Sequence, residues 1–165
     1  MCHGSIIYLR RLGLFINKSN LLKRNPSQPN YGVIVTDVAG NGRFSFFVCG
    51  YGGPNLIYQW DGDSYTAVTD GTLADFGRMA IGMAAGDFDG DGREEIYVLN
   101  TDTFAGQKQF ADRLFDAVGD EWIDLFMYAS NQEVRNLTAG RSVVAVDRRG
   151  SGQYGFYVAN YGGYA

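Results

Sequence analysis

Three copies of one short unit follow one another along this chain of 165 residues. Each copy is an apolar segment, a nine-residue turn that begins with Asp and has Gly at its sixth position, and a second apolar segment. A unit of this size cannot bury its apolar face alone and must stack on its neighbours, so the repeat constrains the architecture more than any other feature. The leading aspartates, Asp37, Asp87 and Asp147, recur after 50 and then 60 residues.

Two further pairs of apolar segments follow the first and second units. Residues 56–60 and 64–68 flank Asp61-Gly62-Asp63, and residues 113–118 and 121–125 flank Gly119-Asp120, which are turn sequences typical of hairpins. Two inner strands and an outer hairpin make a four-stranded blade, and about four to eight such blades form a β-propeller. The sequence therefore predicts an all-β fold: an incomplete β-propeller of about two and a half blades, with repeat cores near residues 31–48, 80–99 and 139–158.

The first thirty residues differ from the rest. They carry five basic residues and no acid, and their apolar residues have a loose helical order. We expect residues 1–29 to be an irregular or helical leader and linker, and residues 30–165 to be the propeller fragment. An organellar transit peptide, a disordered tail, a spliced-on exon and a misplaced start codon all fit such a leader, whereas a clear secretory signal is not found. The apolar residues are Ile6, Leu9, Leu12 and Ile16.

The second turn has carboxylates at positions 1, 3, 5 and 9. Alternate residues of a curled loop point inward together, and Gly92 at position 6 lets the backbone reverse, so a main-chain carbonyl at position 7 can add a ligand. Hard oxygen ligands in such a loop favour calcium, whereas magnesium prefers fewer protein ligands. An exposed Asp-Gly turn without metal is the other reading, but its four carboxylates would repel one another. We predict a Ca²⁺ site made by Asp87, Asp89, Asp91, Arg93 and Glu95.

The sister turns keep less of this pattern. The first keeps Asp37 and Asn41 but has Ala39 and Ser45 at other ligand positions, and the third keeps only Asp147. The sequence leaves open whether these degenerate loops bind metal.

Composition excludes several functions for the repeat region. Residues 31–165 carry a net charge of −9, which repels phosphate backbones, so we expect no nucleic-acid partner. No apolar run reaches the length of a membrane span. The single histidine, His3, lies in the leader, so the body has no histidine-based triad or zinc site. We predict no catalytic residue and no organic cofactor.

Five segments of the repeat region carry a family resemblance: residues 30–37, 50–56, 87–100, 139–152 and 157–161. They resemble the FG-GAP/VCBS repeats of integrin-α-type propellers and, more specifically, the amino-terminal part of the cartilage acidic protein family. The resemblance implies a secreted or surface calcium-binding protein with roles in matrix and adhesion, and no catalytic activity of the propeller.

We therefore expect a non-enzymatic, calcium-binding propeller module that acts as an extracellular-type interaction or adhesion surface for an unidentified protein or matrix partner. Two alternatives stay open: the scaffold portion of a larger propeller-containing hydrolase, and a truncated gene product without independent function. Exposed blade edges also predict self-association.

Overall fold

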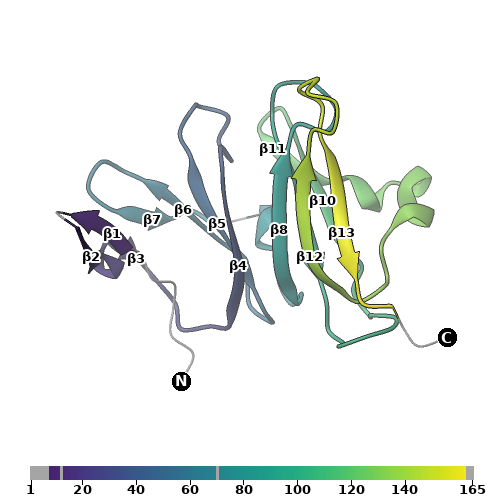
Figure 1. The fold of residues 1–165 in the computed structure, drawn as a ribbon, viewed down its shortest axis with the longest axis horizontal. Helices are drawn as coiled ribbons and strands as arrows, with labels where there is room; N and C mark the ends of the chain where they lie inside the picture. The colour runs from purple at the N-terminus through teal and green to yellow at the C-terminus, as the bar shows by residue number, and fades with distance from the viewer. Residues whose placement is uncertain (1–7, 12, 70, 163–165) are drawn as a thin grey trace.

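The computed structural model describes residues 8–11, 13–69 and 71–162, and these residues are mostly β (Figure 1). Each repeat unit forms one antiparallel inner hairpin, and the first two units add an outer hairpin. The inner pairs are β4 (Asn30–Thr36) with β5 (Ser45–Gly50), β8 (Ala80–Gly86) with β9 (Glu95–Asn100), and β12 (Gly140–Val146) with β13 (Gly155–Asn160). The outer pairs are β6 (Leu56–Trp60) with β7 (Tyr65–Ala67), and β10 (Arg113–Val118) with β11 (Glu121–Asp124).

The sheets confirm the expected all-β partial propeller. The first unit has the strand order β3-β7-β6-β5-β4, the second has β11-β10-β9-β8, and the third contributes the pair β12-β13. The strands β4 to β7 and β8 to β11 follow the order of the chain across their sheets, each antiparallel to the next, and β3 is added at the outer edge of the first sheet. The two outer hairpins lie where the turn sequences predicted them.

The helical expectation for the leader is wrong over the described residues. Strands β1 (Tyr8–Arg11) and β2 (Leu14–Asn17) form an antiparallel hairpin, with Arg11 opposite Leu14. Gly13, in the turn, has a φ of +83°, which suits glycine and would end a helix. Ile6 and Leu12, which supported the helical reading, lie outside the described residues.

The segment after this hairpin joins the first blade. The 3-10 helix η1 (Ser19–Leu21) leads into β3 (Leu22–Lys23), which pairs in parallel with β7 as the outermost strand. Leu22 is buried against a small cluster that contains Tyr58. The other helices are also short 3-10 turns: η2 (Gly71–Ala74), η3 (Leu125–Met127) and η4 (Ala129–Val134). Within the described residues, no helix has the length and hydropathy to cross a bilayer.

The three units stack face to face, with β8 between β4 and β12. A core cluster that includes Phe47, Met83 and Phe115 fills the space between the first and second sheets, and Ile34 packs against it. A second cluster, built on Tyr97 and Leu99, packs against the third unit. Burial of these faces holds the stack together, since each sheet alone would expose its apolar side.

Two glycines at strand ends provide a matched test of this packing. A Cβ at Gly50 would lie 2.1 Å from the carbonyl oxygen of Pro54, whereas a Cβ at Gly155 would meet no atom within 4 Å. We expect Gly50→Ala to lower the free energy of unfolding by about 1–3 kcal/mol, because backbone must move. Gly155→Ala should leave it unchanged or slightly higher. Equal unfolding midpoints in urea for the two variants would contradict the described packing.

Candidate metal centre

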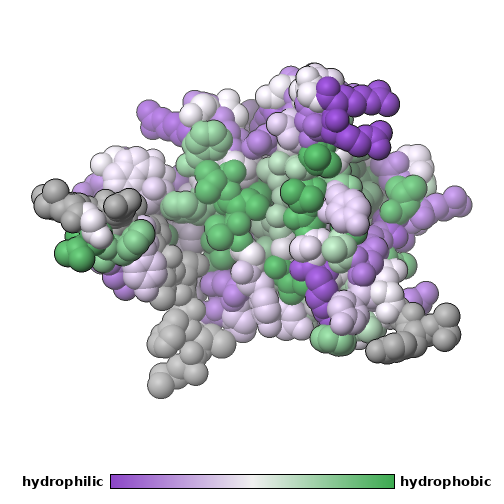
Figure 2. All heavy atoms as spheres, viewed as in Figure 1, coloured by the Kyte–Doolittle hydropathy of each residue, from purple (hydrophilic) through white to green (hydrophobic). Residues whose placement is uncertain are grey.

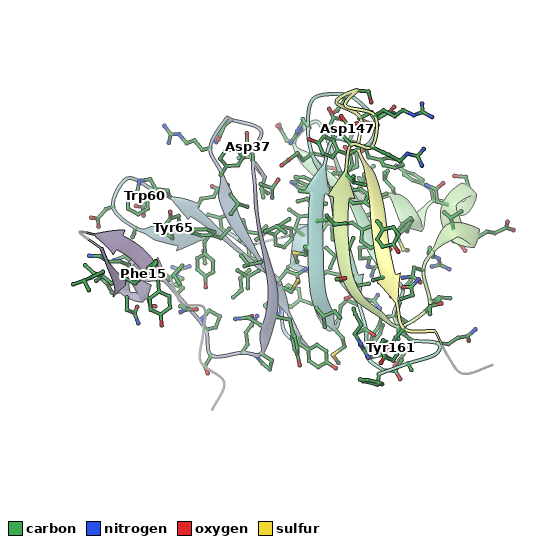
Figure 3. All side chains as sticks on the ribbon, viewed as in Figure 1. Phe15, Asp37, Trp60, Tyr65, Asp147 and Tyr161 are labelled. Atoms are coloured by element: carbon green, nitrogen blue, oxygen red, sulfur yellow. The ribbon has the colours of Figure 1, made fainter. Side chains whose placement is uncertain are left out.

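The second turn joins β8 to β9 and lies at one end of the stack together with the other two turns. Figure 3 places Asp37 and Asp147, the leading residues of the first and third turns, at this same end. Neighbouring turns are linked directly: Thr36 donates a hydrogen bond to Glu94 (2.6 Å), and the amide of Tyr154 donates to the carbonyl of Asp87 (2.8 Å). The turns therefore form one continuous rim.

All three turns share one backbone arrangement. The carboxylate of the leading aspartate accepts a hydrogen bond from the amide of the glycine at position 6, at 2.6 Å for Asp37, 3.0 Å for Asp87 and 2.7 Å for Asp147. These glycines have φ values of +78°, +90° and +83°, a region that residues with a side chain rarely adopt. The glycine at position 6 is therefore required by the shape of the turn, with or without a metal ion.

The second turn adds acids to this frame. Oxygen atoms of Asp87, Asp89 and Glu95 lie within 4.8 Å of one another. Glu95 is only 1% exposed, and its Oε2 accepts hydrogen bonds from the amides of Phe88 and Asp89. Its other oxygen, Oε1, is buried without a hydrogen-bond partner. Because an unpaired buried carboxylate oxygen is costly, this atom fits a role as a cation ligand.

The two remaining predicted ligands lie differently. Asp91 is exposed and outside the group of three acids, and its Oδ1 accepts the amide of Arg93 at 2.7 Å. Arg93 was predicted for its main-chain carbonyl, and that role stays a prediction. Its guanidinium reaches the β10–β11 hairpin, donating to the carbonyl of Gly119 (3.0 Å) and lying 5.9 Å from the ring of Trp122.

Asp116 on β10 is a further acid near this site that the sequence analysis missed. Phe115 pairs with Ile96, so the next pair along the two strands brings Asp116 opposite Glu95. In the first blade Phe46 pairs with Tyr58, which places the neutral residues Ser45 and Gln59 at the same two positions. The acid on the neighbouring strand therefore occurs in the blade whose turn is acidic. A comparison of equivalent strand positions in the two blades reveals this acid, but that comparison requires the register of the strands.

The negative charges of these acids raise one another's pKa values. Burial raises the pKa of Glu95, and the charges of Asp89 and Asp116 raise it further, although the amide of Phe88 opposes them. Burial and the charge of Asp89 likewise raise the pKa of Asp116. Like charges opposite each other across a strand pair destabilise a sheet. A bound divalent cation would remove this repulsion, which is the chemistry that the donor set supports.

The sister turns lack this cluster of acids. Ser45 takes the place of Glu95 in the first turn, and Gly155 takes it in the third. Backbone amides, that of Gly152 first, lower the pKa of Asp147, so hydrogen bonds already stabilise its charge. Across the described ranges, Asp87, Asp89 and Glu95 form the one group of at least three acids, cysteines or histidines with the spacing of a metal site.

Comparisons with known proteins agree with this architecture. Residues 37–98, which include the first two turns, match the model of the FG-GAP-like repeat family. Cartilage acidic protein 1 of Xenopus tropicalis is 46% identical over 149 residues, which cover 83% of this chain and 23% of the relative. The Homo sapiens protein of the same name is 45% identical, with 83% and 22% covered, and that of Mus musculus is 44% identical, with 83% and 23% covered. The chain thus spans less than a quarter of the length of these curated relatives.

The charge on Glu95 can be tested without any metal. Glu95→Gln keeps an oxygen for the two amides but removes the buried charge, so we expect the metal-free free energy of unfolding at pH 7 to rise by about 1 kcal/mol. The native pKa of Glu95 is raised, so its charge destabilises the fold only above its ordinary pKa of 4.5. The difference between variant and wild type should therefore vanish as the pH falls below that value.

Urea unfolding in chelator at several pH values measures this difference. Glu133→Gln is the matched control, because Glu133 is exposed on η4 and the substitution changes the net charge equally. A metal-free Glu95→Gln variant that is less stable than wild type at pH 7 would contradict the described repulsion.

Proposed function

Because the chain is homologous to one portion of the cartilage acidic protein family and contains an FG-GAP-like repeat, we propose that it is a non-enzymatic, calcium-binding β-propeller module that presents an extracellular interaction surface. The observation that supports calcium most directly is that Glu95, which clusters with Asp87 and Asp89, has its Oε1 buried without a hydrogen-bond partner. Asp91 and the carbonyl of Arg93 would complete the ligand set.

Calcium in this position would stabilise the blade. Asp87, Asp89 and Glu95 would hold the ion between the two ends of the inner hairpin, while Asp116 would add negative charge from β10. The guanidinium of Arg93 already fastens the turn to the carbonyl of Gly119 on the outer hairpin. An ion that binds the native state and not the unfolded chain stabilises the native state by mass action.

The relatives suggest where such a module works. Their name connects them with cartilage, so we place this chain outside the cell, with a protein or matrix component as its partner. Calcium-binding modules in that environment work with dissociation constants of about 10⁻⁴ to 10⁻³ M.

Calorimetric titration with calcium tests the proposal. We expect the wild type to bind one ion with a dissociation constant of about 10⁻⁴ to 10⁻³ M. Asp89→Asn should weaken binding at least tenfold, because it removes a charged ligand beside Glu95. Glu133→Gln should bind like the wild type, since Glu133 is exposed on η4 and is not among the predicted ligands. No calcium-dependent heat and no rise in the thermal unfolding midpoint would refute calcium binding.

A further inference from the structure

The connection between β9 and β10 is much longer than its counterpart in the first unit. Residues 101–112 form it, whereas residues 51–55 join β5 to β6. Loops of about 12 residues or more without strands or helices are uncommon in compact domains and are usually functional. This loop belongs to the middle unit, which has a neighbour on each side, so its setting does not depend on where the sequence begins or ends.

A buried ion pair fixes the loop in place. The side chains of Lys108 and Asp112 are fully buried and in contact, and the Lys108 ammonium also donates to the carbonyl of Asn100 at 2.7 Å. Asp112 accepts further hydrogen bonds from Tyr97 and Asn136, each at 2.7 Å. A buried ion pair is stable only when its remaining hydrogen bonds are satisfied. These bonds link the loop to β9 and to the segment before β12, so the loop has one defined conformation.

A β-bulge recurs near the start of each inner strand. The strand register shifts at the same place in β4, β8 and β12, six residues before the leading aspartate. The residues at this place are Tyr31, Ile81 and Arg141. Bulges often redirect a side chain at a functional site. Here all three residues line one cavity of about 410 Å³, together with Tyr51 and residues 101–104 of the loop.

The cavity lies at the rim opposite the three turns. Arg141, in its wall, has its guanidinium 5.2 Å from the ring of Tyr161, and Figure 3 places Tyr161 at the other end of the stack from Asp37 and Asp147. Figure 2 shows this rim in mostly pale colours, whereas the rim of the turns carries much of the deep purple of charged residues. The two rims therefore present different chemistry.

Aromatic rings and one pair of opposite charges line the cavity. The rings of Tyr31 and Tyr51 lie 5.2 Å apart. Phe104 is 71% exposed, and the guanidinium of Arg141 lies 4.5 Å from the centre of its ring. Asp102 accepts one backbone amide of the loop, and its carboxylate keeps further lone pairs for a ligand.

These groups define the chemistry of a ligand. Exposed aromatic rings favour a ligand with a flat apolar face. A carboxylate beside a guanidinium favours a ligand with both hydrogen-bond donors and acceptors. A strongly charged ligand would meet a like charge at either Asp102 or Arg141, which is unfavourable. A neutral saccharide meets all three conditions, because its ring has an apolar C–H face and an edge of hydroxyl groups.

We propose that this cavity binds a neutral oligosaccharide. One sugar ring lies against Phe104 and the tyrosine rings, while its hydroxyl groups donate to Asp102 and accept from Arg141. The inference rests on the proposed interaction surface and names the class of partner that the surface takes. Calcium binds at the opposite rim, so calcium titration and saccharide binding are separate measurements, and either can fail without the other.

An array of neutral, sulfated and carboxylated oligosaccharides, with acidic and basic peptides alongside, is the first test. We expect the whole chain, in calcium-containing buffer, to be retained by a neutral oligosaccharide. Phe104→Ala should weaken that binding by about tenfold or more in calorimetric titration, because it removes an aromatic contact. Phe44→Ala is the matched control and should bind like the wild type, since Phe44 is 66% exposed but lies in the first turn, at the other rim.

The charge pair gives a second readout. The wild type should bind the retained neutral oligosaccharide more tightly than a uronate-containing counterpart of the same length. Asp102→Asn keeps an oxygen for the loop amide but removes the like charge, so it should reduce this preference. Circular dichroism should show every variant folded. Retention of charged saccharides alone, of peptides alone or of no array member would overturn the proposal, as would equal losses of binding for the Phe104 and Phe44 variants.

Discussion

The hydrogen bond from the glycine amide to the leading aspartate carboxylate underlies the rest of this structure. It recurs in every turn and joins residues five positions apart. Because the turn then has one length and one shape, the inner strands keep one register: Thr36 pairs with Ser45, Gly86 with Glu95, and Val146 with Gly155. Equivalent residues consequently point toward equivalent faces, which is the condition for stacking one unit on the next.

Only the second turn combines this shared backbone conformation with a cluster of carboxylates. Position 9 is Ser45, Glu95 or Gly155 in the three turns, and only Glu95 brings a carboxylate into the buried end of the inner hairpin. The charge of Asp116, across the strand pair, raises the pKa of Glu95 further and so makes the ionised form of Glu95 less favourable in the fold. The first and third turns keep the same hydrogen bond without a carboxylate at position 9, so we expect the stability of the middle turn to respond most to a cation. In this arrangement calcium would stabilise the blade and would not need to take part in a reaction.

Stacking by alternate residues has a consequence at the ends of the described stack. A middle unit buries both faces, as β8 does between β4 and β12, whereas the units on either side bury one face each. The valines left exposed on β4 and β12 are of the same kind as those buried inside the stack. Surface of this kind is normally covered by another unit, because exposed apolar sheet faces favour association.

Sequence by itself determined the repeat, the inner and outer hairpins and the acidic turn, because these depend on residues close together along the chain. It misjudged the leader, where a loose apolar spacing suggested a helix and Gly13 instead allows a hairpin. Only the tertiary structure placed Asp116 beside Glu95, since the register of β10 on β9 decides which side chains meet. It also decided which side chains of β4 and β12 are left exposed, because burial depends on how whole sheets pack, and no local pattern specifies that.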